Sequence, residues 1–208
     1  MKKLHGVRLA HHKNTENSAC VPLPLPKLVR IPMSMHIGAP CTPVVKPRET
    51  VQVGQKIGDT DAFMAVPIHS GVSGTVKAIS TYRMSNGRTC PMVEIETDGA
   101  QTVCPEVCPP VVTDKASFLQ AVRESGLVGM GGASFPAHVK LNPKQAVDTL
   151  VINAAECEPY ITSDYRQMVE APEEVLDGVC QVMHWLEIPK AVIGIEVNKP
   201  QAIRILTE

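Results

Sequence analysis

The stretch Ala65–Val76 reads AVPIHSGVSGTV, and it follows the stretch Val51–Gly58, which reads VQVGQKIG. Both combine β-branched residues with closely spaced glycines, which is typical of short strands that turn sharply in a small sheet. The dipeptide Asn86-Gly87 is a strong indicator of a hairpin turn. Because no helical period appears from residue 28 to residue 100, this region predicts a small all-β sandwich or barrel.

Short strands are expected throughout this β region, each bounded by Gly, Pro, Asn or Asp. They are Leu28–Met33, Val51–Val53, Ala65–Ile68, Val72–Ile79 and Met92–Glu96. Residues 1–27 are expected to form an extended arm packed over a domain, because their alternating prolines favour the polyproline II conformation. Residues 101–114, which contain two cysteines and several prolines, are expected to be a linker.

From residue 115 onward the pattern changes to that of an α/β domain. Asp148–Asn153 and Lys190–Val197 have the composition of buried strands, and Pro172–Leu186 is the clearest helix between them. A short helix is expected at Ala116–Ser125, and another is expected to begin at Pro200. This order of strand, helix and strand predicts parallel pairing. Two strands are too few for a closed α/β domain, so we expect either that the sequence is a fragment or that the missing part of the sheet comes from elsewhere.

Composition narrows the class of protein. The 208 residues suit one or two domains and are enough for a hydrophobic core. The formal net charge of -1 and the aromatic content of 3% disfavour a nucleic-acid binder. No apolar run reaches the roughly 18–20 residues of a membrane span. Seven scattered cysteines without a secretory signal favour a reduced cytoplasmic chain, with any membrane attachment made through a partner.

The first candidate for chemistry is Gly126–Lys140, which reads GLVGMGGASFPAHVK. Glycines allow backbone N–H groups to surround a phosphate, and Lys140 could neutralise its charge. The pattern is neither the dinucleotide-binding fingerprint nor a P-loop, and it follows an expected helix rather than a strand. On the residues alone, a plain flexible loop and an anion site are equally well supported.

The second candidate is Asn153–Tyr160, which reads NAAECEPY and follows directly on an expected strand. Ligands of open α/β sheets bind beyond the carboxyl ends of the strands. There, Glu156 and Glu158 could accept hydrogen bonds from a ribose or a ring system, although a bare pair of carboxylates more often forms a solvated acidic turn. The two candidate segments together are stronger evidence for a ligand-binding site than either segment alone.

Gly126–Lys140 followed by Asn153–Arg166 closely resembles the C subunit of the Rnf complex, an NAD-linked ferredoxin oxidoreductase. It resembles more distantly the FMN-carrying subunit of respiratory NADH dehydrogenase. In the β region, His36–Pro40, Val51–Gly58 and Val66–Val76 are similar to the N-terminal barrel-sandwich domain of the same family. The resemblance therefore covers nearly the whole chain.

The resemblance implies a two-domain α+β fold. An all-β barrel-sandwich hybrid is expected at residues 28–100, followed at residues 115–208 by the start of an α/β Rossmann-like domain that binds FMN and NADH. Asn153 is implied to bond the flavin, with Glu156 and Glu158 near the isoalloxazine and the nicotinamide nucleotide. The residues implied to hold the flavin phosphate or ribityl chain are Gly129, Gly131, Gly132, Ala133 and Lys140.

The implied function is electron transfer. FMN and NAD(H) would exchange a hydride, and the flavin would pass single electrons to iron–sulfur clusters. The cluster motif of the family, C-x-x-C-x-x-C-x-x-x-C-P, is absent, so the clusters are expected beyond residue 208 and the chain alone is expected to be inactive. The implied partners are ferredoxin or a similar carrier and the other subunits of a membrane-bound complex, which places the chain on the inner face of the cell membrane.

Alternatives remain open at this point. The same fold could serve a soluble electron-transfer protein of an amino-acid reductase such as proline reductase, or a non-catalytic docking module. Ala155 and Tyr160 depart from the respiratory relatives, which carry an acidic residue and a glycine at these positions. The pair Cys104 and Cys108 has a loosely cluster-like spacing, but prolines follow both cysteines and no fourth ligand is evident, so no metal site is expected.

Overall fold

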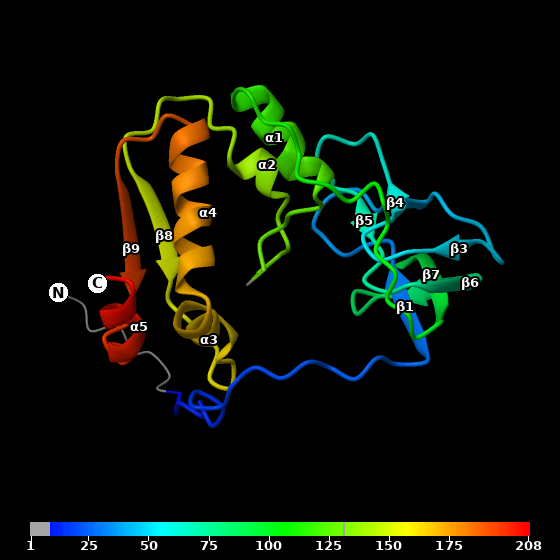
Figure 1. Ribbon diagram of the computed structural model, residues 1–208, viewed down its shortest axis with the longest axis horizontal. Coiled ribbons are helices and arrows are strands. Elements are labelled where there is room, and N and C mark those ends of the chain that lie inside the picture. Colours follow the sequence, from blue (N-terminus) through cyan, green and yellow to red (C-terminus); the bar gives the residue numbers. More distant parts are fainter. Residues whose placement is uncertain (1–8, 131) are drawn as a thin grey trace. The chain divides into compact units, whose positions relative to one another are not determined.

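The structure is a computed structural model that describes residues 9–130 and 132–208 (Figure 1). It divides into two compact units. The first, called the β unit, comprises residues 23–145. The second, called the α/β unit, comprises residues 9–22 together with residues 146–208.

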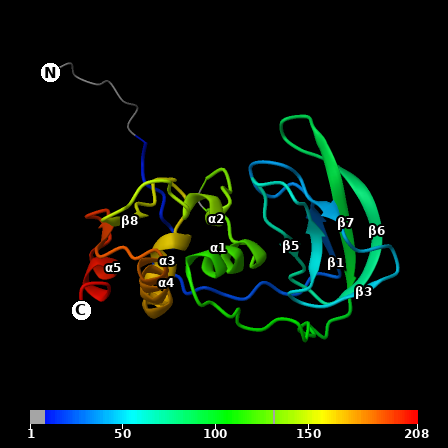
Figure 2. The same ribbon diagram turned by 90° about the horizontal axis from the view of Figure 1, so that it is seen from above.

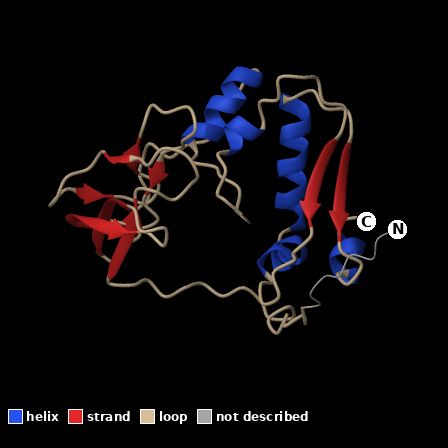
Figure 3. Cartoon of the chain, turned by 180° about the vertical axis from the view of Figure 1, so that it is seen from behind, coloured by secondary structure: helices blue, strands red, loops and turns tan. Residues whose placement is uncertain are grey.

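The β unit is built mainly from short antiparallel strands, followed by two helices (Figure 3). The strands are β1 (Leu28–Pro32), β2 (Thr42–Pro43), β3 (Thr50–Val51), β4 (Lys56–Asp59), β5 (Ile68–His69), β6 (Gly74–Arg83) and β7 (Thr89–Thr97). The helices are α1 (Lys115–Glu124) and α2 (Ala137–Lys140).

The strands of the β unit form two antiparallel sheets, with the orders β1-β7-β6-β3 and β2-β4-β5. The long β6–β7 hairpin runs from Gly74, paired with Thr97, to Arg83, paired with Thr89, and closes on the expected turn (Figure 2). Gly74 is required in this hairpin, because a Cβ there would lie 2.1 Å from the Glu96 carbonyl oxygen.

Both sheets contribute to one hydrophobic core, as expected for a small β sandwich. The buried core residues are Met33, Cys41, Val45, Val51, Ile57, Ile68, Val72, Val76, Val93 and Ile95. The core forms because side chains alternate across each strand, so that every second residue points toward the other sheet.

Two short segments differ from what the sequence predicts, one an expected strand and the other the expected linker. Ala65 and Val66 are buried, but only Ile68 of the expected strand Ala65–Ile68 pairs, as the first residue of β5, because Pro67 has no N–H to donate to a ladder. The expected linker at residues 101–114 is fastened to the sheet near its start, where the Cys104 amide donates to the Val53 carbonyl over 2.8 Å. No local sequence pattern indicates that the linker is bonded to Val53.

Helix α1 packs with the β unit, which differs from the expected domain boundary at residue 115. Asp114 caps the helix by accepting a hydrogen bond from the Ser117 amide over 2.8 Å. At the other end of α1, Glu124 forms an ion pair with Lys56 of β4 at 2.7 Å. The two compact units therefore divide after Gln145, once the glycine-rich segment has ended.

The α/β unit contains β8 (Leu150–Ala154), α3 (Ser163–Glu170), α4 (Pro172–Trp185), β9 (Ala191–Ile195) and α5 (Pro200–Ile205). Strands β8 and β9 are parallel, as expected. The small buried core of the unit consists of Ala154, Tyr165, Met168 and Ala202. Both strands were expected to be buried, but Val151 and Val192 are 68% and 43% exposed, because only one face of this two-stranded sheet is packed against helices.

The N-terminal arm belongs to the α/β unit up to residue 22. The His12 amide donates to the Pro159 carbonyl over 2.9 Å, and the Cys20 amide donates to the Glu170 carboxylate over 3.1 Å. These bonds join the arm to the α/β unit, whereas residues 23–27 of the expected arm belong to the β unit. Among the residues that the structure describes, no helix is both long enough and apolar enough to cross a bilayer.

Candidate functional site

The carboxyl ends of β8 and β9 lie at one edge of their sheet, because Ala154 pairs in register with Ile195. The residues that follow the two strands, Ala155 and Glu196, therefore leave the sheet side by side. Asn153 is exposed near this edge, and its Oδ1 accepts a hydrogen bond from the Ala155 amide over 3.2 Å. This edge is where open α/β sheets bind their ligands.

Glu156 is fully buried at the start of the loop that follows β8. Its Oε1 accepts hydrogen bonds from the amides of Asp164 over 2.9 Å and Tyr165 over 3.3 Å. These amides belong to the first turn of α3, so the carboxylate caps the positive end of that helix from outside it. Glu156 therefore fixes the loop to the helix.

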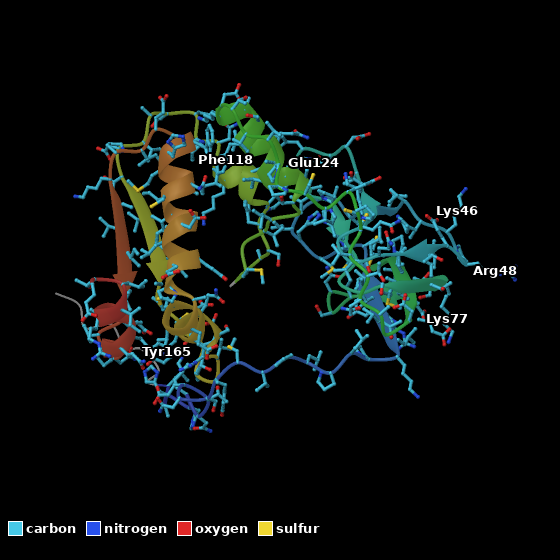
Figure 4. The ribbon with its side chains drawn as sticks, in the orientation of Figure 1. Lys46, Arg48, Lys77, Phe118, Glu124 and Tyr165 are labelled. Carbon is cyan, nitrogen blue, oxygen red and sulfur yellow. The ribbon has the colours of Figure 1, made fainter. Side chains whose placement is uncertain are left out.

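Two lysines share the other carboxylate oxygen of Glu156. Lys13 and Lys199 lie 3.1 and 3.2 Å from Oε2, and both side chains are buried. Burial alone would raise the pKa of the Glu156 carboxyl, but the hydrogen bonds from Lys13, from the Tyr165 amide and from Lys199 outweigh it and lower that pKa. The Lys199 ammonium also lies 4.7 Å from the centre of the ring of Tyr165, the residue labelled in Figure 4.

The rest of the loop is open to solvent. Cys157, Glu158 and Tyr160 are all exposed. The Tyr160 ring stacks on the His12 ring, with centroids 4.9 Å apart and an interplanar angle of 12°. Glu158 thus presents its carboxylate at the surface, whereas the Glu156 carboxylate is surrounded by donors from its own chain.

Three further residues contribute to this edge, and the sequence motifs did not single them out. Lys13 and Lys199 neutralise Glu156 from opposite ends of the chain. Glu196 follows β9 directly, and its buried Oε2 has no hydrogen-bond partner in the described part of the chain. Of the three, only Glu196 could have been found from the sequence. It lies at the end of the second expected strand, in the position that corresponds to Ala155 after the first.

The glycine-rich segment lies in the β unit, where backbone hydrogen bonds hold it to the loop between β1 and β2 and close its own turn. The Ile37 amide lies 3.2 Å from the Ala133 carbonyl oxygen and 3.3 Å from that of Ser134. The Gly129 amide donates to the Phe135 carbonyl over 2.9 Å. The segment is therefore held at both ends of its turn, and Lys140 is exposed at the end of α2.

Two glycines of this segment leave enough open space for a ligand to approach the backbone. A Cβ added at Gly132 would meet nothing within 4 Å, and one at Gly129 would meet only Phe135 backbone atoms at 3.7 and 3.8 Å. Neither glycine has a positive φ. Since the chain itself does not require glycine at either position, both fit a surface on which a phosphate rests against bare backbone. Gly131 lies outside the described residues.

An apolar pocket of about 510 Å³ lies beside the same segment, within the β unit. Val29 and Ile31 of β1 line one side, and Val128, Met130 and Ser134 of the glycine-rich segment line the other. The segment therefore has one side toward the sheet, while Gly129, Gly132 and Ala133 are exposed.

The expected site residues thus divide between the two units. Gly129, Gly132, Ala133 and Lys140 belong to the β unit, and Asn153, Glu156 and Glu158 belong to the α/β unit. The structure places Asn153 at the end of β8 and the two glutamates in the loop that follows it, and it places the first four residues on one turn and the helix after it. Across residues 9–130 and 132–208, no group of three or more His, Cys, Asp and Glu side chains could hold a metal ion.

Two family models match the chain. The one for the RnfC barrel sandwich hybrid domain matches residues 2–100, and the one for the Nuo51 FMN-binding domain matches residues 122–208. The first confirms the expected barrel-sandwich hybrid. The second joins the glycine-rich segment and the loop after β8 in one FMN-binding domain.

Three relatives are similar to this chain along most of its length. The C subunit of the Na⁺-translocating ferredoxin:NAD⁺ oxidoreductase complex of Acetobacterium woodii is 42% identical over 93% of this chain and 45% of its own length. The C subunit of the proton-translocating ferredoxin:NAD⁺ oxidoreductase complex of Clostridium ljungdahlii is 41% identical over 93% of this chain and 44% of its own. The C subunit of the ion-translocating oxidoreductase complex of Rhodobacter capsulatus is 37% identical over 97% and 40%.

This chain spans less than half the length of these relatives. The two family models nevertheless follow each other along nearly all of it, in the order that the sequence predicts. The chain belongs to the family of RnfC-like subunits, and its two halves match the models of the RnfC barrel sandwich hybrid domain and of the Nuo51 FMN-binding domain.

Proposed function

We propose that this chain is the flavin-carrying part of an electron-transfer subunit in an NAD-linked ferredoxin oxidoreductase. The observation that carries the proposal is the match of residues 122–208 to an FMN-binding domain. It is supported by relatives that are named as C subunits of ferredoxin:NAD⁺ oxidoreductase complexes. We propose NADH as the hydride donor or acceptor for the same flavin.

The residues proposed to hold FMN have the chemistry that the cofactor needs. The bare backbone at Gly129 and Gly132, with the exposed Ala133 beside it, suits a phosphate or ribityl chain, and the exposed Lys140 ammonium would balance the phosphate charge. Gly131 is part of the same proposal, although it lies outside the described residues. Asn153 is proposed to bond the flavin through its side-chain amide.

Within the loop after β8, the two glutamates have different proposed roles. Glu158 is exposed, so its carboxylate can accept hydrogen bonds from hydroxyl groups of the flavin or of the nicotinamide nucleotide. Glu156 lies near the same ligands but acts through its loop, because its carboxylate already accepts hydrogen bonds from α3, Lys13 and Lys199. When bound, FMN would exchange a hydride with NADH and release electrons singly to iron–sulfur clusters.

The wider setting is also a proposal. We propose that the β8–α3–α4–β9 segment is the start of a Rossmann-like domain. The proposed partners are the other subunits of a membrane-bound complex and ferredoxin or a similar carrier. The iron–sulfur clusters are proposed to lie outside this chain, which would itself be located in the cytoplasm at the inner face of the membrane.

The test is a flavin-retention experiment on the natural polypeptide that contains this chain, beside the 208-residue chain itself. Each is incubated with FMN and desalted, and its visible spectrum is recorded before and after NADH. We expect the natural polypeptide to keep a flavin band that NADH bleaches. We expect the 208-residue chain to show no NADH reaction of its own.

Matched variants assign the proposed roles. Lys140→Ala is expected to weaken FMN retention, because it removes the charge that balances the phosphate. Glu158→Gln is expected to raise the KM for NADH more than it weakens FMN binding. Lys144→Ala, which changes an exposed lysine close to α2, is the control and is expected to alter neither. If the natural polypeptide keeps no flavin, the proposal is wrong and a docking module becomes the better interpretation.

A further inference from the structure

We propose that Lys13 is a positioning residue for the loop from Glu156 to Ile161, where its ammonium acts as a tethered monovalent cation. The inference rests on the proposed function, because this loop carries Glu158 and follows Asn153. It assigns to the N-terminal arm a part in cofactor binding that the arm's sequence does not indicate.

The Lys13 ammonium lies inside a cage of oxygen atoms that the loop supplies. Nζ lies 2.9 Å from the carbonyl oxygen of Glu156, 2.8 Å from that of Glu158 and 2.6 Å from that of Ile161. The Glu156 Oε2 atom lies 3.1 Å away and completes the set. An ammonium has only three protons, so four oxygens around it resemble the carbonyl and carboxylate shell of a bare cation more than a set of separate hydrogen bonds.

The cage determines the shape of the loop. Its three carbonyl groups come from residues up to five positions apart, and all of them point toward one centre. Without a cation, these dipoles and the buried Glu156 carboxylate would repel one another. The loop would then have to turn its carbonyl groups outward to reach water. The position of Glu158 on the surface therefore depends on the ammonium.

Lys199 cannot replace Lys13 in this role. Its Nζ contacts the Glu156 carboxylate at 3.2 Å and lies over the Tyr165 ring. Within the described part of the chain, the Lys199 ammonium donates to that carboxylate and to none of the three loop carbonyls. Lys199 thus neutralises Glu156, while Lys13 organises the backbone that follows it.

The arm holds Lys13 in place from both sides. On one side, the His12 amide bonds the Pro159 carbonyl and the His12 ring stacks on Tyr160. On the other side, the Thr15 and Thr162 hydroxyl oxygens lie 2.6 Å apart. The ammonium is therefore delivered by a preorganised segment, which lowers the entropic cost of ordering the loop.

The first experiment tests the cage without any cofactor. Lys13→Ala leaves room for an external ion, so ammonium or potassium chloride should raise its thermal midpoint above that in choline chloride at equal ionic strength. Trp185 fluorescence is the readout, since this single tryptophan lies in the same unit. The wild-type chain and Lys190→Ala, which changes an exposed lysine of that unit, should show no such preference.

The second experiment measures FMN affinity in the natural polypeptide that contains this chain. Lys13→Ala should weaken FMN or NADH binding about tenfold or more, because small displacements of ligand-contacting groups have effects of that size. Ammonium chloride should restore most of the loss, which a general loss of stability would not predict. If Lys13→Ala does not fold, Lys13→Met, which keeps most of the side chain, is measured instead.

Each outcome has a definite meaning. Cation-dependent stability together with rescued cofactor affinity supports the proposal. An unchanged FMN and NADH affinity in a folded Lys13 variant overturns it, whatever the salt effect. A wild-type polypeptide that binds no FMN overturns the proposed function. In that case the cation experiment still decides whether Lys13 organises the loop, and equal stability in ammonium and choline would remove that role as well.

Discussion

Gly126 has a φ of +71°, and a Cβ at this residue would lie 2.8 Å from the Pro67 carbonyl oxygen and 3.2 Å from His69 Nδ1. This glycine ends α1 and starts the glycine-rich segment. It is therefore required by the fold itself, unlike Gly129 and Gly132. At the level of single residues, the segment combines one structural glycine with others that the chain does not need for packing.

Gly126→Ala is expected to destabilise the β unit by about 1–3 kcal/mol, because alanine is strained at positive φ and its Cβ would meet the Pro67 carbonyl. Urea unfolding measured by circular dichroism is the test. Gly178→Ala is the control, since Gly178 lies within α4 with open space around it. This control is expected to be stabilising by about 0.5–1 kcal/mol. Equal effects of the two substitutions would contradict the steric argument.

At the level of elements, a charged cluster fastens α1 to strand β4. Lys56 pairs with Asp59 at 2.8 Å and with Glu124 at 2.7 Å, and Arg123 pairs with Asp59 at 3.3 Å. Burial alone would raise the pKa of both carboxyls, but the hydrogen bonds from Lys56 and their other donors lower them below 3.8 for Asp59 and 4.5 for Glu124. Burial alone would lower the pKa of Lys56, but its hydrogen bonds with Asp59 and Glu124 outweigh burial and raise that pKa.

The sign of the pH dependence follows from these directions. The stabilisation from Asp59 and Glu124 is present above their unfolded pKa values and is lost as the pH falls through the folded ones. The contribution of Lys56 is complete below 10.5 and is lost as the pH rises through its folded pKa. Lys56→Met should therefore lower the urea midpoint clearly at pH 7 and much less at about pH 2.

Lys46→Met is the matched control for this prediction. Lys46 is an exposed lysine of the same unit (Figure 4). Its replacement should change the urea midpoint little at either pH, because exposed charges contribute little to stability. A Lys56→Met effect of the same size at both pH values would show that packing of the lysine stem, rather than the ion pairs, holds α1.

At the level of the whole molecule, the chain has two separate cores, one in each compact unit. The unfolding of each core can be followed through different side chains. Cys41, Cys90 and Cys104 are buried in the β unit, and burial raises the pKa of the Cys41 thiol to about 11. Trp185 belongs to the α/β unit, whose cysteines are exposed. Thiol labelling and tryptophan fluorescence can therefore follow the two units independently.

Deletion of residues 1–22 is expected to lower the Trp185-monitored stability to urea by about 2–3 kcal/mol, because it removes Lys13 from a buried charge cluster in which Lys199 remains. Labelling of the buried cysteines during unfolding should keep its midpoint, since residues 23–145 retain their own core. A shift of the thiol-monitored midpoint by the same amount would show that the two units unfold as one.

The order of elements was predictable from the amino-acid sequence, because hydrophobic periodicity and the positions of Gly and Pro are local properties. The β6–β7 hairpin at Asn86-Gly87, the parallel pair β8 and β9, and the long helix α4 were all predictable in this way. The glycine-rich segment and the loop after β8 also stood out, and the family comparison placed them in one FMN-binding domain.

The tertiary structure alone decided which distant residues meet. Lys13 and Glu156 are 143 positions apart, and Lys56 and Glu124 are 68 positions apart. No local pattern could assign the arm to the α/β unit or helix α1 to the β unit. A charged side chain looks the same in the sequence whether water or an opposite charge surrounds it. Only the folded chain shows that Glu156 is buried between two ammonium groups while Glu158 remains open to solvent.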